Sequence, residues 1–273
     1  MEQTKLNELK QIAAKIRLGV LEGVHAAASG HPGGSLSIAD IMAYLYFEEL
    51  NVRADEPNWA DRDRFVLSKG HTAPALYAAL ALKGFFPESE LSKLRHVDSF
   101  LQGHPDMKGT PGVDMSTGSL GLGFSTACGM ALAAKIDGKD YRTYTIVGDG
   151  ESEEGQIWEA AMFASHYKLD NLCVILDLNG LQIDGPIAEV MNPAPHDEKF
   201  RAFGFHVISI NGHDFDAIEA AFAEAKTVTD RPTVIIANTV KGKGVSFMEN
   251  QVGWHGKAPS TEQYEAAIAE LNA

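Results

Sequence analysis

The sequence is poor in cysteine, with only Cys128 and Cys173 among 273 residues. Both lie in apolar segments, so we expect two buried free thiols rather than a disulfide framework. No run of about eighteen apolar residues is present, which excludes a transmembrane helix. Residues 1–20 are charged and have the spacing of a helix, without the apolar stretch and cleavage site of a signal peptide. These absences indicate a cytoplasmic protein.

Basic residues are also few: 23 Lys and Arg stand against 37 Asp and Glu, which gives a formal net charge of -14. The sequence shows no basic stripe that could replace phosphate counterions, so we exclude nucleic acid as a partner. The same charge opposes an anionic ligand such as a diphosphate or a sugar phosphate. Such a ligand would need a metal ion, helix N-termini or a partner's arginines to offset the field.

Apolar strand-like and helix-like segments alternate along a length that suits one large domain, residues 1–273. The alternation implies parallel strands joined by right-handed crossovers, and hence an α/β fold with a mainly parallel sheet flanked by helices. Ligands of such sheets bind beyond the carboxyl ends of the strands. We expect the segment SGHPGGSLS (29–37) to end the first helix and residues 85–119 to be rich in loops. Strands are expected at 64–67, 143–148, 171–178, 206–211 and 233–239, and helices at 4–28, 37–47, 73–83, 121–136, 153–167, 214–228 and 261–271.

Two turns at neighbouring strand ends carry oxygen ligands. Gly148-Asp149-Gly150 ends one strand, and Asn179 follows the next, so the two polar side chains can be neighbours. A carboxylate and an amide oxygen suit Mg²⁺ or Ca²⁺ rather than zinc, and a carbonyl, phosphate oxygens and water would complete the shell. The two glycines allow a diphosphate to approach the backbone closely. Each turn alone is equally an ordinary strand-ending turn; together they have the shape of a thiamine-diphosphate motif.

The segment VGDGESEEGQIWEAAMFASHYKLDNLCVILDLNGLQIDG (147–185) resembles the cofactor-binding segment of transketolases. The resemblance implies a thiamine-diphosphate-binding fold in which Asp149, Asn179 and the carbonyl of Leu181 hold Mg²⁺, or Ca²⁺ in its place. It further implies that Glu154 supports the site and contacts a neighbouring subunit.

Four histidines lie in motifs of the same family: SGHPGG (His31), LSKGH (His71), QGHPD (His104) and GWHGKAP (His255). One His-Pro alone is more often an ordinary loop histidine, but four in the family's order favour a site. Imidazole both donates and accepts hydrogen bonds near neutral pH, which suits the hydroxyl and carbonyl groups of a ketose. The resemblance implies that His31, His104 and His255 line the substrate channel, that His255 also contacts the cofactor, and that His71 lies near the diphosphate. The remaining histidines are expected to be structural or exposed: His25, His96, His166, His196, His206 and His213.

Further cofactor contacts come from STGSLGLG (116–123), which resembles the family's T-G-P-L-G-Q-G. The resemblance places Gly118 and Leu120 against the cofactor. It places Ile183, from the segment 147–185, against the cofactor too. Ser119 and Leu122 depart from the usual Pro and Gln, which affects only local loop detail. The basic segment TVKGKG (239–244) could bind phosphate through Lys241 or Lys243, or it could be a solvated loop.

The resemblance covers nearly the whole chain but only the first part of a full transketolase. It implies transfer of a two-carbon glycolaldehyde unit from xylulose 5-phosphate to ribose 5-phosphate or erythrose 4-phosphate (EC 2.2.1.1), in the pentose phosphate pathway. A separately encoded C-terminal subunit would supply the pyrimidine-binding domain and the activating glutamate, in an α2β2 heterotetramer. The helix-like ending favours a natural subunit over a truncated chain.

Three alternatives remain. Another thiamine enzyme, a deoxyxylulose-phosphate synthase or an oxo-acid dehydrogenase subunit, is disfavoured by SGHPGG and GWHG. A specialised transketolase for a sulfonated or branched sugar stays open, because the residues that read the sugar's tail would lie mostly in the partner. The last alternative is a noncatalytic module that binds Mg²⁺ and a phosphate ligand.

Overall fold

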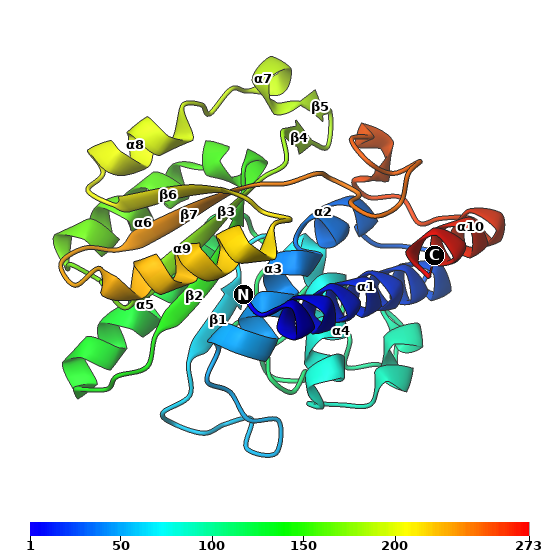
Figure 1. The fold of residues 1–273 in the computed structure, drawn as a ribbon, viewed down its shortest axis with the longest axis horizontal. Coiled ribbons are helices and arrows are strands. Elements are labelled where there is room, and N and C mark those ends of the chain that lie inside the picture. Colours follow the sequence, from blue (N-terminus) through cyan, green and yellow to red (C-terminus); the bar gives the residue numbers. More distant parts are fainter. Residues whose placement is uncertain (273) are drawn as a thin grey trace.

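A parallel sheet of five strands forms the centre of the molecule in the computed structural model, which describes residues 1–272 (Figure 1). The strand order is β1-β2-β3-β7-β6, and every pairing is parallel. This confirms the predicted α/β fold. The strands are β1 (Arg64–Leu67), β2 (Thr143–Gly148), β3 (Leu172–Leu178), β6 (His206–Asn211) and β7 (Thr233–Asn238), and a small antiparallel ribbon pairs β4 (Leu181–Gln182) with β5 (Gly185–Pro186).

Helices cover both faces of this sheet (Figure 1). One face packs against α1 (Gln3–Ala26), α3 (Ala39–Tyr44), α4 (Ala73–Lys83) and α9 (Phe215–Thr227), with α10 (Thr261–Leu271) beside α1. The other face packs against α5 (Leu122–Asp137), α6 (Gly155–His166) and α8 (His196–Ala202).

Successive side chains of a strand point to opposite faces of the sheet, which explains why the protein has two separate hydrophobic cores. In β3, Cys173 and Ile175 point to the α1 side, whereas Leu172, Val174 and Leu176 point to the α5 side. A strand that is buried on both faces must be apolar at nearly every position, as LCVILDL is. Cys173, like Cys128 in α5, is a buried free thiol, as predicted.

Most predicted elements agree with the structure to within two residues, but two predictions near the N-terminus are wrong in part. The expected break after the first helix is present at residues 27–31, but α2 (Pro32–Ser37) begins within the same segment, because proline is pre-organised for the first turn of a helix. The helix expected at 37–47 is divided into α3 and a π-turn at Leu45–Glu49. Two short helices had not been predicted, α7 (Ile187–Val190) and α8.

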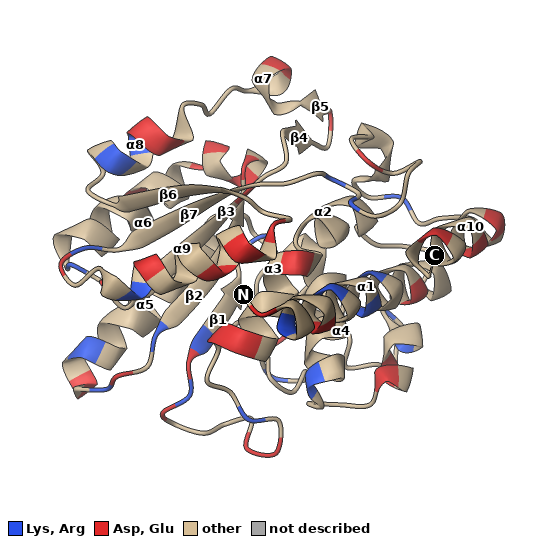
Figure 2. Cartoon of the chain, viewed as in Figure 1, with Lys and Arg blue, Asp and Glu red and all other residues tan. Residues whose placement is uncertain are grey.

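Within residues 1–272, no helix is both long and apolar enough to cross a membrane. Acidic and basic residues alternate over the helices in the view of Figure 2, and no continuous basic stripe appears on this side.

Candidate functional site

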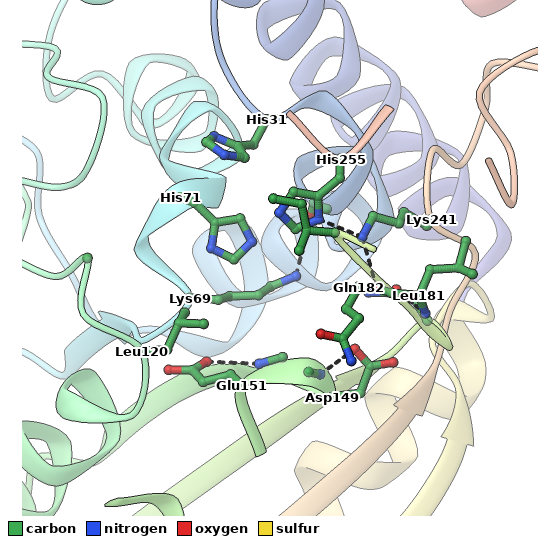
Figure 3. Close-up of a pocket in the computed structure, with 16 residues that line it drawn as sticks. His31, Lys69, His71, Leu120, Asp149, Glu151, Leu181, Gln182, Lys241 and His255 are labelled. Carbon is green, nitrogen blue, oxygen red and sulfur yellow. Dashed lines mark hydrogen bonds between the residues drawn. The ribbon is translucent and has the colours of Figure 1, made fainter. Parts of the chain in front are cut away.

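A cavity of about 300 Å³ opens at the carboxyl ends of the central strands. Its walls come from segments that are far apart in the sequence, and they carry most of the polar residues singled out from the motifs. Figure 3 shows three histidines on one side of the cavity and two carboxylates on the other. The lining residues are His31, Gly34, Lys69, His71, Gly118, Leu120, Gly148, Asp149, Gly150, Glu151, Asn179, Leu181, Gln182, Ile183, Lys241 and His255.

Asp149 lies at the end of β2 and is 2% exposed. One carboxylate oxygen accepts the Gly150 N–H (2.9 Å), and the other accepts the Gly180 N–H (2.6 Å) from the turn after β3. The two predicted turns are therefore neighbours, as β2 and β3 pair up to Gly148 and Asp177. Burial, followed by the nearby charge of Asp177, raises the pKa of Asp149 to about 6. A cation at this carboxylate would relieve both effects.

The Asn179 side chain is oriented by Asp177, a fully buried carboxylate at the end of β3. Asn179 Nδ2 donates to Asp177 (2.9 Å), so its amide oxygen faces the other way, where it accepts the Leu181 N–H (3.2 Å). Asp177 also accepts hydrogen bonds from Ser37, Lys69 and Thr239. Burial alone would raise the pKa of Asp177, but the Lys69 ammonium and the hydrogen bonds outweigh it, and the pKa is lowered. Asp177 thus joins four loops that border the cavity.

Glu151 is a third buried carboxylate, and it lies on the same side of the cavity as Asp149 (Figure 3). It accepts hydrogen bonds from Ser68 Oγ and from the backbone N–H groups of Gly121 (2.8 Å) and Gly148 (3.0 Å). Burial raises its pKa, although these three donors partly offset the effect. The contacts tie the ends of β1 and β2 to the start of α5.

Three of the four motif histidines, His31, His71 and His255, line the cavity together, and His104 does not. The ring centroids of His31 and His71 are 5.2 Å apart, those of His31 and His255 5.5 Å, and those of His71 and His255 5.3 Å. His104 is exposed, with its ring centroid 6.4 Å from that of His31 and its side chain beside Gly118. Four loops thus bring their imidazoles to one place.

The histidines of the cavity are neutral at physiological pH. Burial, followed by the charge of Arg95, lowers the pKa of His31 to about 4. Burial, followed by the charge of Lys241, lowers the pKa of His255 to about 3, and burial also lowers the pKa of His71. His31 Nδ1 is buried and has no hydrogen-bond partner among residues 1–272. A neutral, unpartnered ring nitrogen is suited to a ligand's hydroxyl or carbonyl group.

Lys241 is the buried cation nearest the carbonyl of Leu181. Its Nζ donates to that carbonyl (2.9 Å) and to His255 Nδ1 (2.9 Å). Because His255 Nδ1 accepts, the neutral ring carries its proton on Nε2, which remains a donor. Burial, followed by the charge of Lys69, lowers the pKa of Lys241 to about 8. Lys243 lies outside the cavity and pairs with Glu249 (3.1 Å), so only one of the two candidate lysines enters the site.

The remaining predicted residues divide between the cavity and its rim. Gly118 and Leu120 line it, and so does Ile183, although that side chain is 61% exposed. Glu154 is exposed at the N-terminus of α6 and does not line the cavity. Its predicted role at a subunit contact stays a prediction.

Sequence reasoning missed several residues of the cavity wall. Asp177, the one charged residue of the apolar strand LCVILDL, could have been noticed, because a charge buried in a sheet must have polar partners nearby. The lysine of LSKGH was passed over in favour of the adjacent histidine. The lining residues missed are Gly34, Lys69, Glu151 and Gln182, and the buried Asp177, which binds Lys69 from outside the lining, was missed as well.

The donor set suits a hard divalent cation that shares its shell with a ligand. Asp149, Asn179 and Leu181 all line one cavity, and the carboxylate, amide and carbonyl oxygens of these residues each keep lone pairs beyond their present hydrogen bonds. No group of three or more His, Cys, Asp or Glu with metal-binding geometry exists within residues 1–272. A metal here would therefore depend on backbone, amide and ligand oxygens.

The cavity lies at the carboxyl edge of a parallel sheet, which is where α/β domains of this kind bind their ligands. Residues 8–271 match the family described as the thiamine diphosphate binding domain of transketolase. The chain belongs to the transketolase family. Transketolase from Campylobacter jejuni has the same fold, with a TM-score of 0.91 and 36% identity over 97% of this chain and 43% of that one.

The relatives differ in length. The chain is 50% identical to the 6-deoxy-6-sulfo-D-fructose transketolase subunit SqwG of Clostridium sp. (strain MSTE9), over 97% of this chain and 96% of that protein. It is 42% identical to an apulose-4-phosphate transketolase subunit of Phocaeicola vulgatus, over 98% of this chain and 95% of that protein. It is 44% identical to human transketolase over 99% of this chain, which spans only 43% of the human protein.

Proposed function

We propose that the chain is the cofactor-holding subunit of a split transketolase, which moves a two-carbon glycolaldehyde unit from a ketose phosphate to an aldose phosphate. The observation that carries the proposal is the convergence of Asp149, Asn179, the Leu181 carbonyl and Lys241 with three neutral histidines on one cavity. Thiamine diphosphate, when bound, supplies the electron sink needed to break and form a carbon–carbon bond beside a carbonyl.

The residues of the chain then divide into two groups. Asp149, Asn179 and Leu181 would hold Mg²⁺, or Ca²⁺ in its place, and Lys241 would offset the charge of the diphosphate. Gly148 and Gly150 let the diphosphate approach the backbone, and Gly118, Leu120, Ile183 and His71 would border the cofactor, in line with the sequence prediction.

The histidines His31, His104 and His255 would bind the substrate's hydroxyl and carbonyl oxygens. His31 offers Nδ1, and His255 offers Nε2–H. Because both stay neutral above about pH 5, they orient the sugar and can pass a proton without bringing fixed positive charge into the cavity.

A partner chain completes the proposal. The two relatives that this chain matches over nearly their whole length are both named as transketolase subunits. We expect a separately encoded chain to supply the pyrimidine-binding domain, its activating glutamate and further phosphate-binding cations, in an α2β2 assembly in the cytoplasm. Glu154, exposed at the start of α6, is the residue we expect to meet that partner.

Three donors are candidates, and one of them, apulose 4-phosphate, is suggested by the 42% identity to an apulose-4-phosphate transketolase subunit. Xylulose 5-phosphate, with ribose 5-phosphate or erythrose 4-phosphate as acceptor, is the donor that the family resemblance predicts and would place the enzyme in the pentose phosphate pathway. A sulfonated ketose is favoured by the 50% identity to a sulfofructose transketolase subunit, compared with 44% to human transketolase.

The deciding experiment measures ketol transfer with thiamine diphosphate and Mg²⁺, for this chain alone and for the complex that co-purifies with it. Xylulose 5-phosphate, 6-deoxy-6-sulfo-D-fructose and apulose 4-phosphate are compared as donors. Activity in the complex alone supports the split enzyme, and the ratio of kcat/KM values identifies the donor. Activity of the isolated chain would disprove the need for a partner, and cofactor binding without transfer by any donor would leave only a binding module.

A further inference from the structure

The loop after β7 carries Lys241 into the cavity, and its position depends on residues that lie outside the cavity. The N–H of Val240, directly before Lys241, donates to Nε2 of His213 at 2.9 Å. On the other side of Lys241, the backbone carbonyl of Lys243 accepts a hydrogen bond from Nε of Arg17 at 3.0 Å. The lysine is therefore held on both sides by side chains from distant parts of the chain.

The hydrogen bonds of His213 define its tautomer. Because Nε2 accepts the Val240 N–H, this nitrogen carries no proton, so a neutral ring has its proton on Nδ1. Nδ1 lies 2.7 Å from Oδ2 of Asp40 and donates to it. Asp40 in turn accepts two hydrogen bonds from Arg17, at 3.1 Å and 2.6 Å. Both ring nitrogens thus have a hydrogen-bond partner. A second proton would have to sit on Nε2, where it would point at the Val240 N–H and break that hydrogen bond.

The whole arrangement is shielded from water. Arg17 is 7% exposed and Asp40 is 6% exposed, and the His213 side chain is 13% exposed. Burial alone would raise the pKa of Asp40, but Arg17 and His213 outweigh it and the pKa is lowered, so the carboxylate remains an acceptor. A hydrogen bond that water cannot replace fixes its partner more firmly than an exposed one.

We propose that His213 is a positioning residue, which fixes the Val240 amide and thereby places the Lys241 ammonium beside the Leu181 carbonyl and His255. His213 itself does not line the cavity, so it acts only through the loop. The proposal rests on the proposed function in one respect: the benefit of a correctly placed Lys241 is measured as diphosphate binding.

The first test follows the loop without any ligand. Amide hydrogen exchange is compared for the full chain and for His213→Phe, which removes both hydrogen bonds, and His213→Gln, which retains an acceptor. We expect exchange in residues 239–244 to be about tenfold faster in the Phe variant and less changed in the Gln variant. His206→Phe is the matched control, since it removes a histidine of β6 that pairs with Glu224 at the surface. Unchanged exchange in 239–244 would overturn the proposal, as would faster exchange throughout the chain.

The second test is a double-mutant cycle read by calorimetric binding of thiamine diphosphate in the presence of Mg²⁺. We expect His213→Phe to weaken binding about tenfold when Lys241 is present, as is typical when the residue supporting a ligand group is lost. In the Lys241→Met background the same change should have no further effect. Equal losses in both backgrounds would show that His213 does not act through Lys241. Absence of binding by the unchanged chain would refute the proposed function, while the exchange experiment would still decide the part played by His213.

Discussion

At the scale of single residues, the site is built from charges that the fold buries at a cost to its own stability. Asp149 is almost completely buried beside a second carboxylate, Asp177, which no purely structural requirement would favour. Such residues are expected where stability is given up for binding. The two predictions that follow concern the carboxylate and the ammonium of the cavity.

Asp149→Asn should change how stability depends on pH. The pKa of Asp149 is about 6 in the folded chain against an ordinary value of 3.8, so its protonation stabilises the fold below these values, and this contribution is lost as pH rises through 6. Relative to the Asn variant, the unchanged chain should lose about 1 kcal/mol of unfolding free energy between pH 5 and pH 7.5. Urea unfolding without metal measures this, with exposed Asp98→Asn as control. A pH-independent difference would contradict the prediction.

Lys241→Met should weaken thiamine diphosphate binding at least tenfold at pH 7, because a buried hydrogen bond to a charged group contributes about 1.5–3 kcal/mol. The pKa of Lys241 is about 8, so its charge is lost as pH rises, and the affinity of the unchanged chain should fall about tenfold between pH 7 and pH 9. The Met variant should show no such fall over this range. Calorimetry measures both, with Lys243→Met as the neighbouring control. A decline of equal size in the Met variant would assign the effect to another group.

At the scale of elements, strands were predictable and loop geometry was not. Every predicted strand exists, and β2 and β3 were the clearest, because a strand buried on both faces is apolar nearly throughout, as TYTIVG and LCVILDL are. The motif residues also came together, since parallel strands end at one edge. The buried partners Lys69, Glu151 and Asp177 were missed because their roles depend on contacts between loops 30–140 residues apart, which no local pattern records.

Two glycines of α5 should respond in opposite ways to alanine. A Cβ at Gly123 would lie 2.5 Å from the backbone Cα of Ser68, whereas one at Gly129 meets nothing within 4 Å. We expect Gly123→Ala to destabilise the chain by about 1–3 kcal/mol through overpacking. Gly129→Ala should stabilise it by about 0.5–1 kcal/mol, because alanine is the better helix former. Urea unfolding of the two variants tests the close contact between α5 and the end of β1; equal effects would contradict it.

At the scale of the whole molecule, one cavity joins loops from residue 31 to residue 255. A ligand that binds there should stabilise the chain globally rather than one loop. With thiamine diphosphate and Mg²⁺ at about 100 times the Kd, we expect about 2.7 kcal/mol of stabilisation and a Tm rise of roughly 5 °C. Thiamine, which lacks the diphosphate, should give almost none. Hydrogen exchange protection confined to a single wall of the cavity would disprove the joint site.

The span of these loops also has a consequence for protein synthesis. His31 is translated early and His255 late, and the histidines, Asp149 and Lys241 share one cavity only after most of the chain has left the ribosome. Contacts between such distant segments form slowly, because long loops must close first. A nascent or prematurely terminated chain therefore has no complete place for the cofactor. A ligand that needs the whole cavity can therefore bind only after nearly all of the chain has been made and folded.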